Sequence, residues 1–270
     1  MEQPKNNLKI VADKKSARML LPNMLTLIGV CIGLTSIRFA LDGRFELAII
    51  AIMFAALIDG LDGRIARLIK GTSKVGKELD SLTDMISFGV APAFIMYFWK
   101  LNTLGRFGWL LCLVFVICVA LRLARFNINS NQEPSWRDNF FEGVPSPAGG
   151  ILVLTPLIIS LSGFDFFQLN YDIIVPIFFV TTSFLLISKF PSYSFKKIVI
   201  RRRTTIFLLF GIVLFFGLLL IYTFNVIALS AIIYLLLLPI SYVHYQKIKN
   251  EHEKDKIQDE DDLELSLIHI

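Results

Sequence analysis

The fold and the chemistry of this chain are decided by one stretch: Asp59-Gly60-Leu61-Asp62-Gly63-Arg64-Ile65-Ala66-Arg67, with Gly76, Asp80 and Asp84 after it. Its four carboxylates lie beside or inside long apolar runs. Ionisable groups within membrane segments are costly and usually functional. Acidic side chains with no histidine or cysteine nearby favour hard divalent cations. The stretch therefore predicts a divalent-cation site in a membrane protein.

The composition supports a helical membrane protein. Of the 270 residues, 55% are hydrophobic, and the mean hydropathy is +0.65. Only helices and closed barrels satisfy their backbone groups in lipid, and the apolar runs are too long and continuous for barrel strands. The net charge of +5 suits contact with anionic lipid. Since no soluble basic domain is present, nucleic acid is not an expected partner.

Eight apolar segments are each predicted to form a membrane-spanning helix. They lie at residues 20–41, 45–67, 79–99, 107–125, 148–162, 172–188, 204–223 and 226–245. With the N-terminus inside, 23 of the 27 Lys and Arg residues fall on the cytoplasmic side, as the positive-inside rule requires. We expect a multi-pass cell-membrane protein whose termini and acidic cluster all face the cytoplasm.

This topology divides the chain into five parts. We expect a basic cytoplasmic segment (1–19), a six-helix core (20–188), a basic cytoplasmic linker (189–203), an additional transmembrane hairpin (204–246) and a charged cytoplasmic tail (247–270).

The acidic residues form two pairs at helical spacing. Asp59 and Asp62 are three residues apart, and Asp80 and Asp84 are four apart, so each pair shares one helix face. The residues between the pairs allow the chain to return antiparallel, so that the pairs face one cleft. Four carboxylates this close would repel each other, and cations remove that penalty. Two divalent ions suit a site that grips a phosphate and breaks one of its bonds.

Two further residues of the stretch point to a phosphate ligand. A glycine inside a helix is less stable by about 1 kcal/mol than an alanine, so the presence of Gly63 calls for an explanation. A ligand that approaches the backbone closely is one such explanation. Arg67 follows one turn later, and its guanidinium can reach a phosphate oxygen.

The spacing D-x2-D-G-x2-A-R-x8-G-x3-D-x3-D is the signature of the CDP-alcohol phosphatidyltransferase family, and by it this chain is identified as a member. The matches are Asp59, Asp62, Gly63, Ala66, Arg67, Gly76, Asp80 and Asp84. The stretch Pro22–Thr26 also resembles the family's sequence entering the first helix, near the nucleotide.

The resemblance covers roughly residues 20–188 and implies an all-α core of six helices, a homodimer and two Mg²⁺ or Mn²⁺ ions. The metal ligands it implies are Asp59, Asp62, Asp80 and Asp84. Asp84 would also act as general base toward the acceptor alcohol. Gly63, Arg67 and Ser73 would contact the CDP portion of the substrate.

Three stretches resemble the bacterial phosphatidylserine synthases within this family: Ser87–Ala93, Leu123–Asn127 and Phe141–Ala148. They imply a transferase of phospholipid biosynthesis that converts CDP-diacylglycerol and L-serine into phosphatidylserine and CMP.

A serine site needs a group that pairs with the serine carboxylate. Arg122 and Arg125 lie three apart, and arginine binds carboxylates bidentately. Asn127 and Ser146 would add hydrogen bonds. The alternative is that both arginines are only interfacial anchors.

Two alternatives remain open from the residues. Another acceptor of the same family is one: glycerol 3-phosphate, inositol or choline. A phosphorylated acceptor would need a denser cationic pocket than two arginines offer. The other is a divalent-cation transporter, but a transport pathway should place polar groups in both halves of the membrane, and here the acids lie on one side only.

Overall fold

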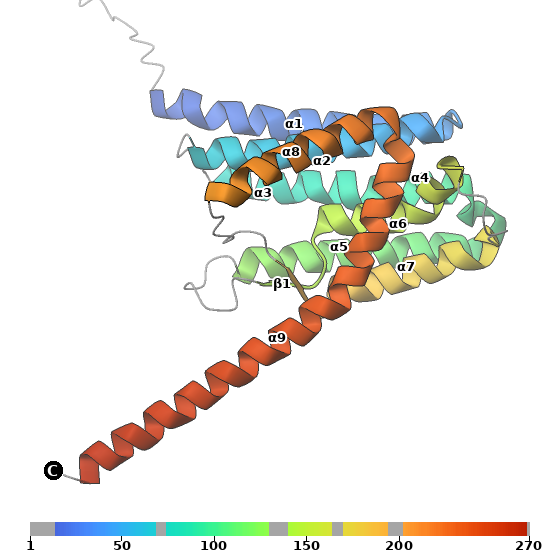
Figure 1. Cartoon of the computed structure of the whole chain (residues 1–270). Helices are drawn as coiled ribbons and strands as arrows, with labels where there is room; N and C mark the ends of the chain where they lie inside the picture. Colours follow the sequence, from blue (N-terminus) through green and yellow to red (C-terminus); the bar gives the residue numbers. More distant parts are fainter. Residues whose placement is uncertain (1–13, 69–73, 130–139, 164–169, 194–201, 269–270) are drawn as a thin grey trace, which may run out of the picture.

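The computed structural model describes residues 14–68, 74–129, 140–163, 170–193 and 202–268, and these form a helical bundle (Figure 1). The α-helices are α1 (Lys14–Leu41), α2 (Phe45–Leu68), α3 (Lys74–Asp84), α4 (Ala91–Trp99), α5 (Arg106–Asn129), α6 (Ser146–Leu161), α7 (Tyr171–Ile187), α8 (Arg202–Ile221) and α9 (Thr223–Ile268). A π-helix, η1 (Met85–Val90), joins α3 to α4, and a 3-10 helix, η2 (Leu101–Leu104), precedes α5. Each of the eight predicted apolar segments is helical.

Four helices in the described part of the chain are long and apolar enough to cross a membrane: Pro22–Leu41, Val75–Trp99, Arg106–Ile128 and Thr223–Ile248. Three shorter apolar helices are Ser146–Leu161, Tyr171–Ile187 and Thr205–Ile221. The side chains of residues 205–218, in α8, are all exposed. An apolar helix exposed on every side is stable in lipid and not in water. The protein is therefore an α-helical membrane protein.

The π-helix directly follows Asp84, where the sequence predicted one uninterrupted helix. Helix α1 packs closely there: a Cβ at Gly33 would lie 3.1 Å from the Cα of Ser87, and Ser87 Oγ donates to the carbonyl of Gly29 at 3.4 Å. Single π-turns inside α-helices are frequent at functional sites. The wider turn changes the direction of the side chains between α3, which carries Asp80 and Asp84, and α4.

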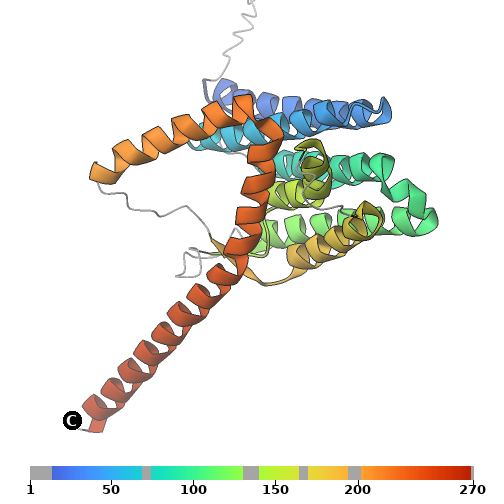
Figure 2. The same ribbon diagram turned by 45° about the vertical axis from the view of Figure 1, so that its right-hand side comes forward.

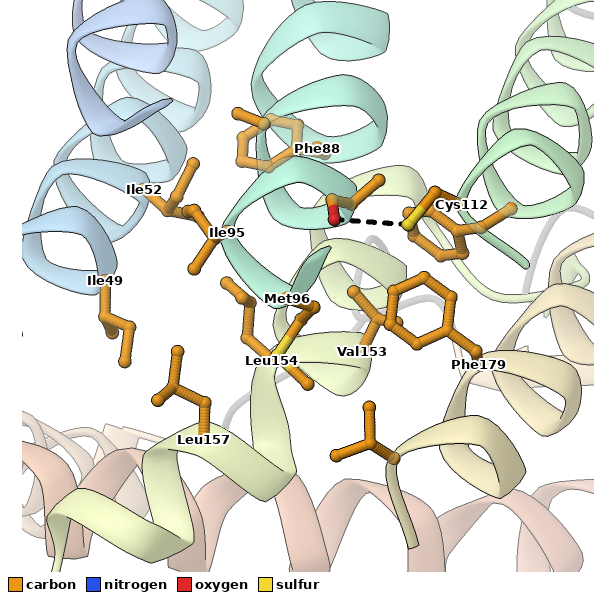
Figure 3. Packing of buried hydrophobic residues seen from close by; sticks show 14 of the residues in the cluster. Ile49, Ile52, Phe88, Ile95, Met96, Cys112, Val153, Leu154, Leu157 and Phe179 are labelled. Atoms are coloured by element: carbon orange, nitrogen blue, oxygen red, sulfur yellow. Dashed lines mark hydrogen bonds between the residues drawn. The ribbon is translucent and has the colours of Figure 1, made fainter. Parts of the chain in front are cut away.

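The core lies around α6, which packs against α4, α7 and α9. Figure 3 shows its centre, where Leu154 and Leu157 of α6 meet side chains from the surrounding helices. Phe115 and Phe179 contact each other edge to face, with 5.5 Å between ring centroids. The thiol of Cys112 donates to the Ala93 carbonyl at 3.5 Å. This close packing of apolar side chains holds the helices, and so the ends that carry the aspartates, in fixed positions.

A two-stranded antiparallel sheet was not predicted from the sequence. It pairs β1 (Phe140–Glu142) with β2 (Pro191–Tyr193), so the beginning of the predicted linker 189–203 is a strand. Gly143 follows β1 with φ +77°, and a Cβ there would lie 2.9 Å from the Ser188 carbonyl oxygen. Only glycine fits this position readily. The sheet fixes the point where α6 begins.

Helix α9 runs across the side of the bundle, whereas α1 lies beside α2 and α5 lies beside α7 (Figures 1 and 2). It packs against α6 and β2 and then continues away from the bundle as a long helix. The predicted charged tail is helical as far as Ile268.

Candidate active site

The four aspartates converge at one end of the bundle. Asp59 and Asp62 lie on α2, and Asp80 and Asp84 lie on α3. One carboxylate oxygen from each of Asp59, Asp62 and Asp80 can be chosen so that all lie within 4.8 Å of one another. The carboxylates of Asp59 and Asp84 lie close enough to interact electrostatically. The predicted arrangement, with the two pairs facing each other, is therefore confirmed.

These carboxylates are partly or fully buried, and none of them forms an ion pair with a residue that the structure describes. Asp62 is 4% exposed, and Oδ1 of Asp84 is buried with no hydrogen-bond partner in the described chain. The ion pairs found among the described residues, Arg38–Asp42 and Lys100–Asp172, lie elsewhere. Buried unpaired charges cost several kcal/mol each. An all-oxygen ligand set with a free buried oxygen fits hard divalent cations.

Helix α1 contributes a residue that orients Asp62. Thr26 Oγ1 donates to Asp62 Oδ2 at 2.8 Å and also lies 3.0 Å from the Pro22 carbonyl. Carboxylates that bind metals are commonly held by such hydrogen bonds. The stretch Pro22–Thr26, which the resemblance placed near the nucleotide, thus reaches the acidic cluster through Thr26.

Gly63 lies on an open face of α2. A Cβ built at this position would meet no heavy atom within 4 Å. No neighbouring group of the described protein requires a glycine at this position. Because glycine destabilises a helix relative to alanine, close approach of a ligand remains the explanation for its presence. The backbone of Arg67 lies one turn further along α2, but its side chain is outside the described part. Ser73 lies outside the described residues altogether.

A chain of polar contacts links Asp84 to α5 and α6. Ser146, the first residue of α6, is fully buried and donates to Asp84 Oδ2 at 2.8 Å. The Nη1 of Arg122 donates to Ser146 Oγ at 2.5 Å. The Arg122 guanidinium also lies 5.6 Å from the centre of the Phe126 ring. Two of the residues predicted for the serine site, Arg122 and Ser146, are thus brought to the aspartate cluster.

The other two predicted serine-site residues bind neighbouring helices. Arg125 Nη1 donates to the Ile187 carbonyl, at the end of α7, at 2.7 Å. Asn127 Nδ2 donates to Ser81 Oγ on α3 at 2.9 Å. Ser81, which the sequence analysis did not single out, follows Asp80 directly. These two contacts hold α5 against α7 and α3, and so position the α3 carboxylates relative to Arg122.

The fold and the cluster define the class of protein: a helical membrane protein with an acidic site suited to divalent cations. The chain belongs to the CDP-alcohol phosphatidyltransferase family, whose sequence profile matches residues 19–186. The match contains α2 and α3 with all four aspartates, and it ends before α8 and α9.

Three bacterial proteins similar to this chain each carry the name CDP-diacylglycerol–serine O-phosphatidyltransferase. That of Mycobacterium leprae (strain TN) is 43% identical over 176 residues, covering 64% of this chain and 57% of the relative. That of Helicobacter pylori (strain 26695) is 38% identical over 179 residues, covering 66% and 74%. That of Bacillus subtilis (strain 168) is 34% identical over 177 residues, covering 66% and 92%. The match thus spans little more than half of the mycobacterial relative.

Proposed function

We propose that this chain transfers the phosphatidyl group of CDP-diacylglycerol to L-serine and releases CMP. The observation that carries the proposal is the contact sequence Arg122–Ser146–Asp84. Through Ser146 it links a partly buried guanidinium, suited to a carboxylate, to the carboxylate that would receive the proton of the acceptor hydroxyl. The names of the three relatives support the same reaction.

Asp59, Asp62, Asp80 and Asp84 would hold two divalent ions, Mg²⁺ or Mn²⁺. Bound there, these ions would neutralise the diphosphate and stabilise the charge on the leaving CMP. The chain's own contribution is orientation: Thr26 holds Asp62, and Ser146 holds Asp84. The open face at Gly63 allows the diphosphate to approach the α2 backbone, with Arg67 one turn away.

In the proposed reaction Asp84 acts as general base. Its Oδ2 is held by Ser146, whereas Oδ1 has no partner in the described chain, so Oδ1 is the atom that takes the proton from the serine hydroxyl. The serine oxygen forms a bond to the phosphorus nearest the diacylglycerol. The bond from that phosphorus to the bridging oxygen breaks, and CMP departs with the electron pair. Positioning and charge stabilisation supply most of the rate.

The experiment measures CMP release by the purified protein in mixed micelles with CDP-diacylglycerol and MgCl₂ or MnCl₂. L-serine, glycerol 3-phosphate, inositol and choline are offered separately, and the Asp84→Asn variant serves as the blank. We expect CMP and phosphatidylserine with serine alone. Release of CMP with one of the other alcohols, and not with serine, would overturn the serine assignment while keeping the family.

We further propose eight membrane spans with both termini and the site on the cytoplasmic side of the cell membrane. The distribution of Lys and Arg supports this topology. A fluorescent protein fused after Ile270 should fluoresce in cells, since it folds in the cytoplasm and fails to mature when exported. A homodimer is proposed from the family resemblance alone, and light scattering of the detergent-solubilised protein tests it.

A further inference from the structure

The helix α9 brings a tyrosine to the acceptor side of the site, from outside the part of the chain that matches the family. Tyr234 lies on α9, and the family match ends at residue 186. Its ring packs against an apolar cluster that includes Val144, Ala148 and Leu152, around the beginning of α6. Ser146 lies within this same segment. The C-terminal helix thus covers the α6 end of the aspartate site.

The hydroxyl of Tyr234 is buried and makes no hydrogen bond of ordinary length with the described residues. Its polar neighbour is Ser192 of β2. The Ser192 hydroxyl donates its own proton to the Gly143 carbonyl at 2.8 Å, so toward Tyr234 it could act only as an acceptor, and that bond would need a closer approach. A buried hydroxyl without a partner is costly and needs an explanation. A phenylalanine would pack equally well here, so a ligand is the reason that we assign to the oxygen.

Arg122 lies near Tyr234, close enough for the two side chains to interact electrostatically. Arg122 makes one side-chain hydrogen bond within the described chain, to Ser146, although a guanidinium carries five N–H donors. Around Ser146, a partly buried guanidinium with further N–H donors therefore lies near a buried phenol hydroxyl. A carboxylate is the ligand that uses both.

We propose that Tyr234 is a specificity-determining residue, whose hydroxyl donates a hydrogen bond to the carboxylate of the acceptor while Arg122 binds the same carboxylate. The inference rests on the proposed function, because it takes an amino acid as the acceptor. It deepens that function by assigning acceptor selection partly to α9. An alcohol that lacks a carboxylate would leave the Tyr234 hydroxyl and the remaining Arg122 donors without a partner, which disfavours its binding.

The test compares Tyr234→Phe with Tyr222→Phe, a control that removes a hydroxyl from an exposed tyrosine between α8 and α9. A hydrogen bond to a charged group is strong enough to change affinity about tenfold or more. We expect Tyr234→Phe to raise the KM for L-serine by about that factor. Its kcat, its KM for CDP-diacylglycerol and its melting temperature should stay near the unmodified values. Tyr222→Phe should change none of these.

An unchanged KM for serine in Tyr234→Phe would overturn the inference. So would a lower kcat at unchanged KM, because that result would mean that Tyr234 acts on Asp84 through Arg122 and Ser146. Combining Tyr234→Phe with Arg122→Lys gives a second check: the two changes should be less than additive in the KM for serine if both groups bind one carboxylate. If the unmodified protein releases no CMP with serine, the proposed function itself fails.

Discussion

Replacing Ser146 by alanine tests the link between the acceptor side and the aspartate cluster. The change removes one buried hydroxyl, which donates to Asp84 Oδ2 at 2.8 Å and accepts from Arg122 Nη1 at 2.5 Å. Hydrogen bonds to charged groups contribute about 1.5–3 kcal/mol each. If the Asp84 bond is needed to hold the general base in place, its loss lowers kcat by about 10- to 150-fold.

The stability of the protein should fall as well, since both charged groups stay buried after the change. An unsatisfied buried group costs about 1–3 kcal/mol, visible as a lower melting temperature in detergent. Ser162→Ala is the matched control. Ser162 follows the other end of α6, and its hydroxyl donates to the Ile159 carbonyl at 2.7 Å.

Serine-dependent CMP release, measured at saturating serine and CDP-diacylglycerol, gives kcat for both variants and the unmodified protein. We expect a large loss in Ser146→Ala and less than a twofold change in Ser162→Ala. A Ser146→Ala protein with full kcat and an unchanged melting temperature would refute the reasoning, because the contact would then position nothing that the reaction needs.

Three other perturbations test the site. Asp84→Asn should abolish turnover while the protein still inserts and elutes as a single species from a sizing column; substantial residual CMP release would remove its assignment as base. Gly63→Ala should raise the KM for CDP-diacylglycerol, because a methyl group occupies the open α2 face, whereas Gly211→Ala on exposed α8 should leave it unchanged; equal KM values in the two variants would contradict the close approach of the diphosphate. EDTA should stop CMP release, and excess Mg²⁺ or Mn²⁺ should restore it; activity that survives exhaustive chelation would exclude the metal assignment.

The sequence predicted the helices and the aspartate cluster well for the same physical reason. Apolar runs long enough to cross a bilayer leave few alternatives to a helix. The spacings 59/62 and 80/84 then fix which side chains share a face. A short connection between two such helices brings the faces together. The convergence of Asp59, Asp62 and Asp80 follows from these local rules.

Features that depend on contacts between distant segments were missed. The π-helix after Asp84 lies where α1 approaches closely at Gly33, and no local pattern encodes such a contact. The strands β1 and β2 are three residues each and lie about fifty residues apart in sequence, so neither shows a periodicity. In the sequence, Tyr234 is one aromatic residue within the apolar run 226–245, and nothing in that run marks its hydroxyl as functional. Only the crossing of α9 over the beginning of α6 reveals that its hydroxyl lies near Arg122.

The charge of the proposed site explains why two divalent ions are needed. Four ionised aspartates, Arg122 and the proposed phosphate ligand Arg67 together carry a charge of minus two, which would repel the doubly negative diphosphate of a CDP-lipid. One divalent ion only neutralises the site, and a second makes it positive and attractive to that substrate. Arg122 is therefore free to serve the acceptor: its hydrogen bond goes to Ser146, not directly to a carboxylate. In the arrangement that we propose, the metals would attract the lipid diphosphate, and the groups contributed by α5, α6 and α9 would select the alcohol that attacks it.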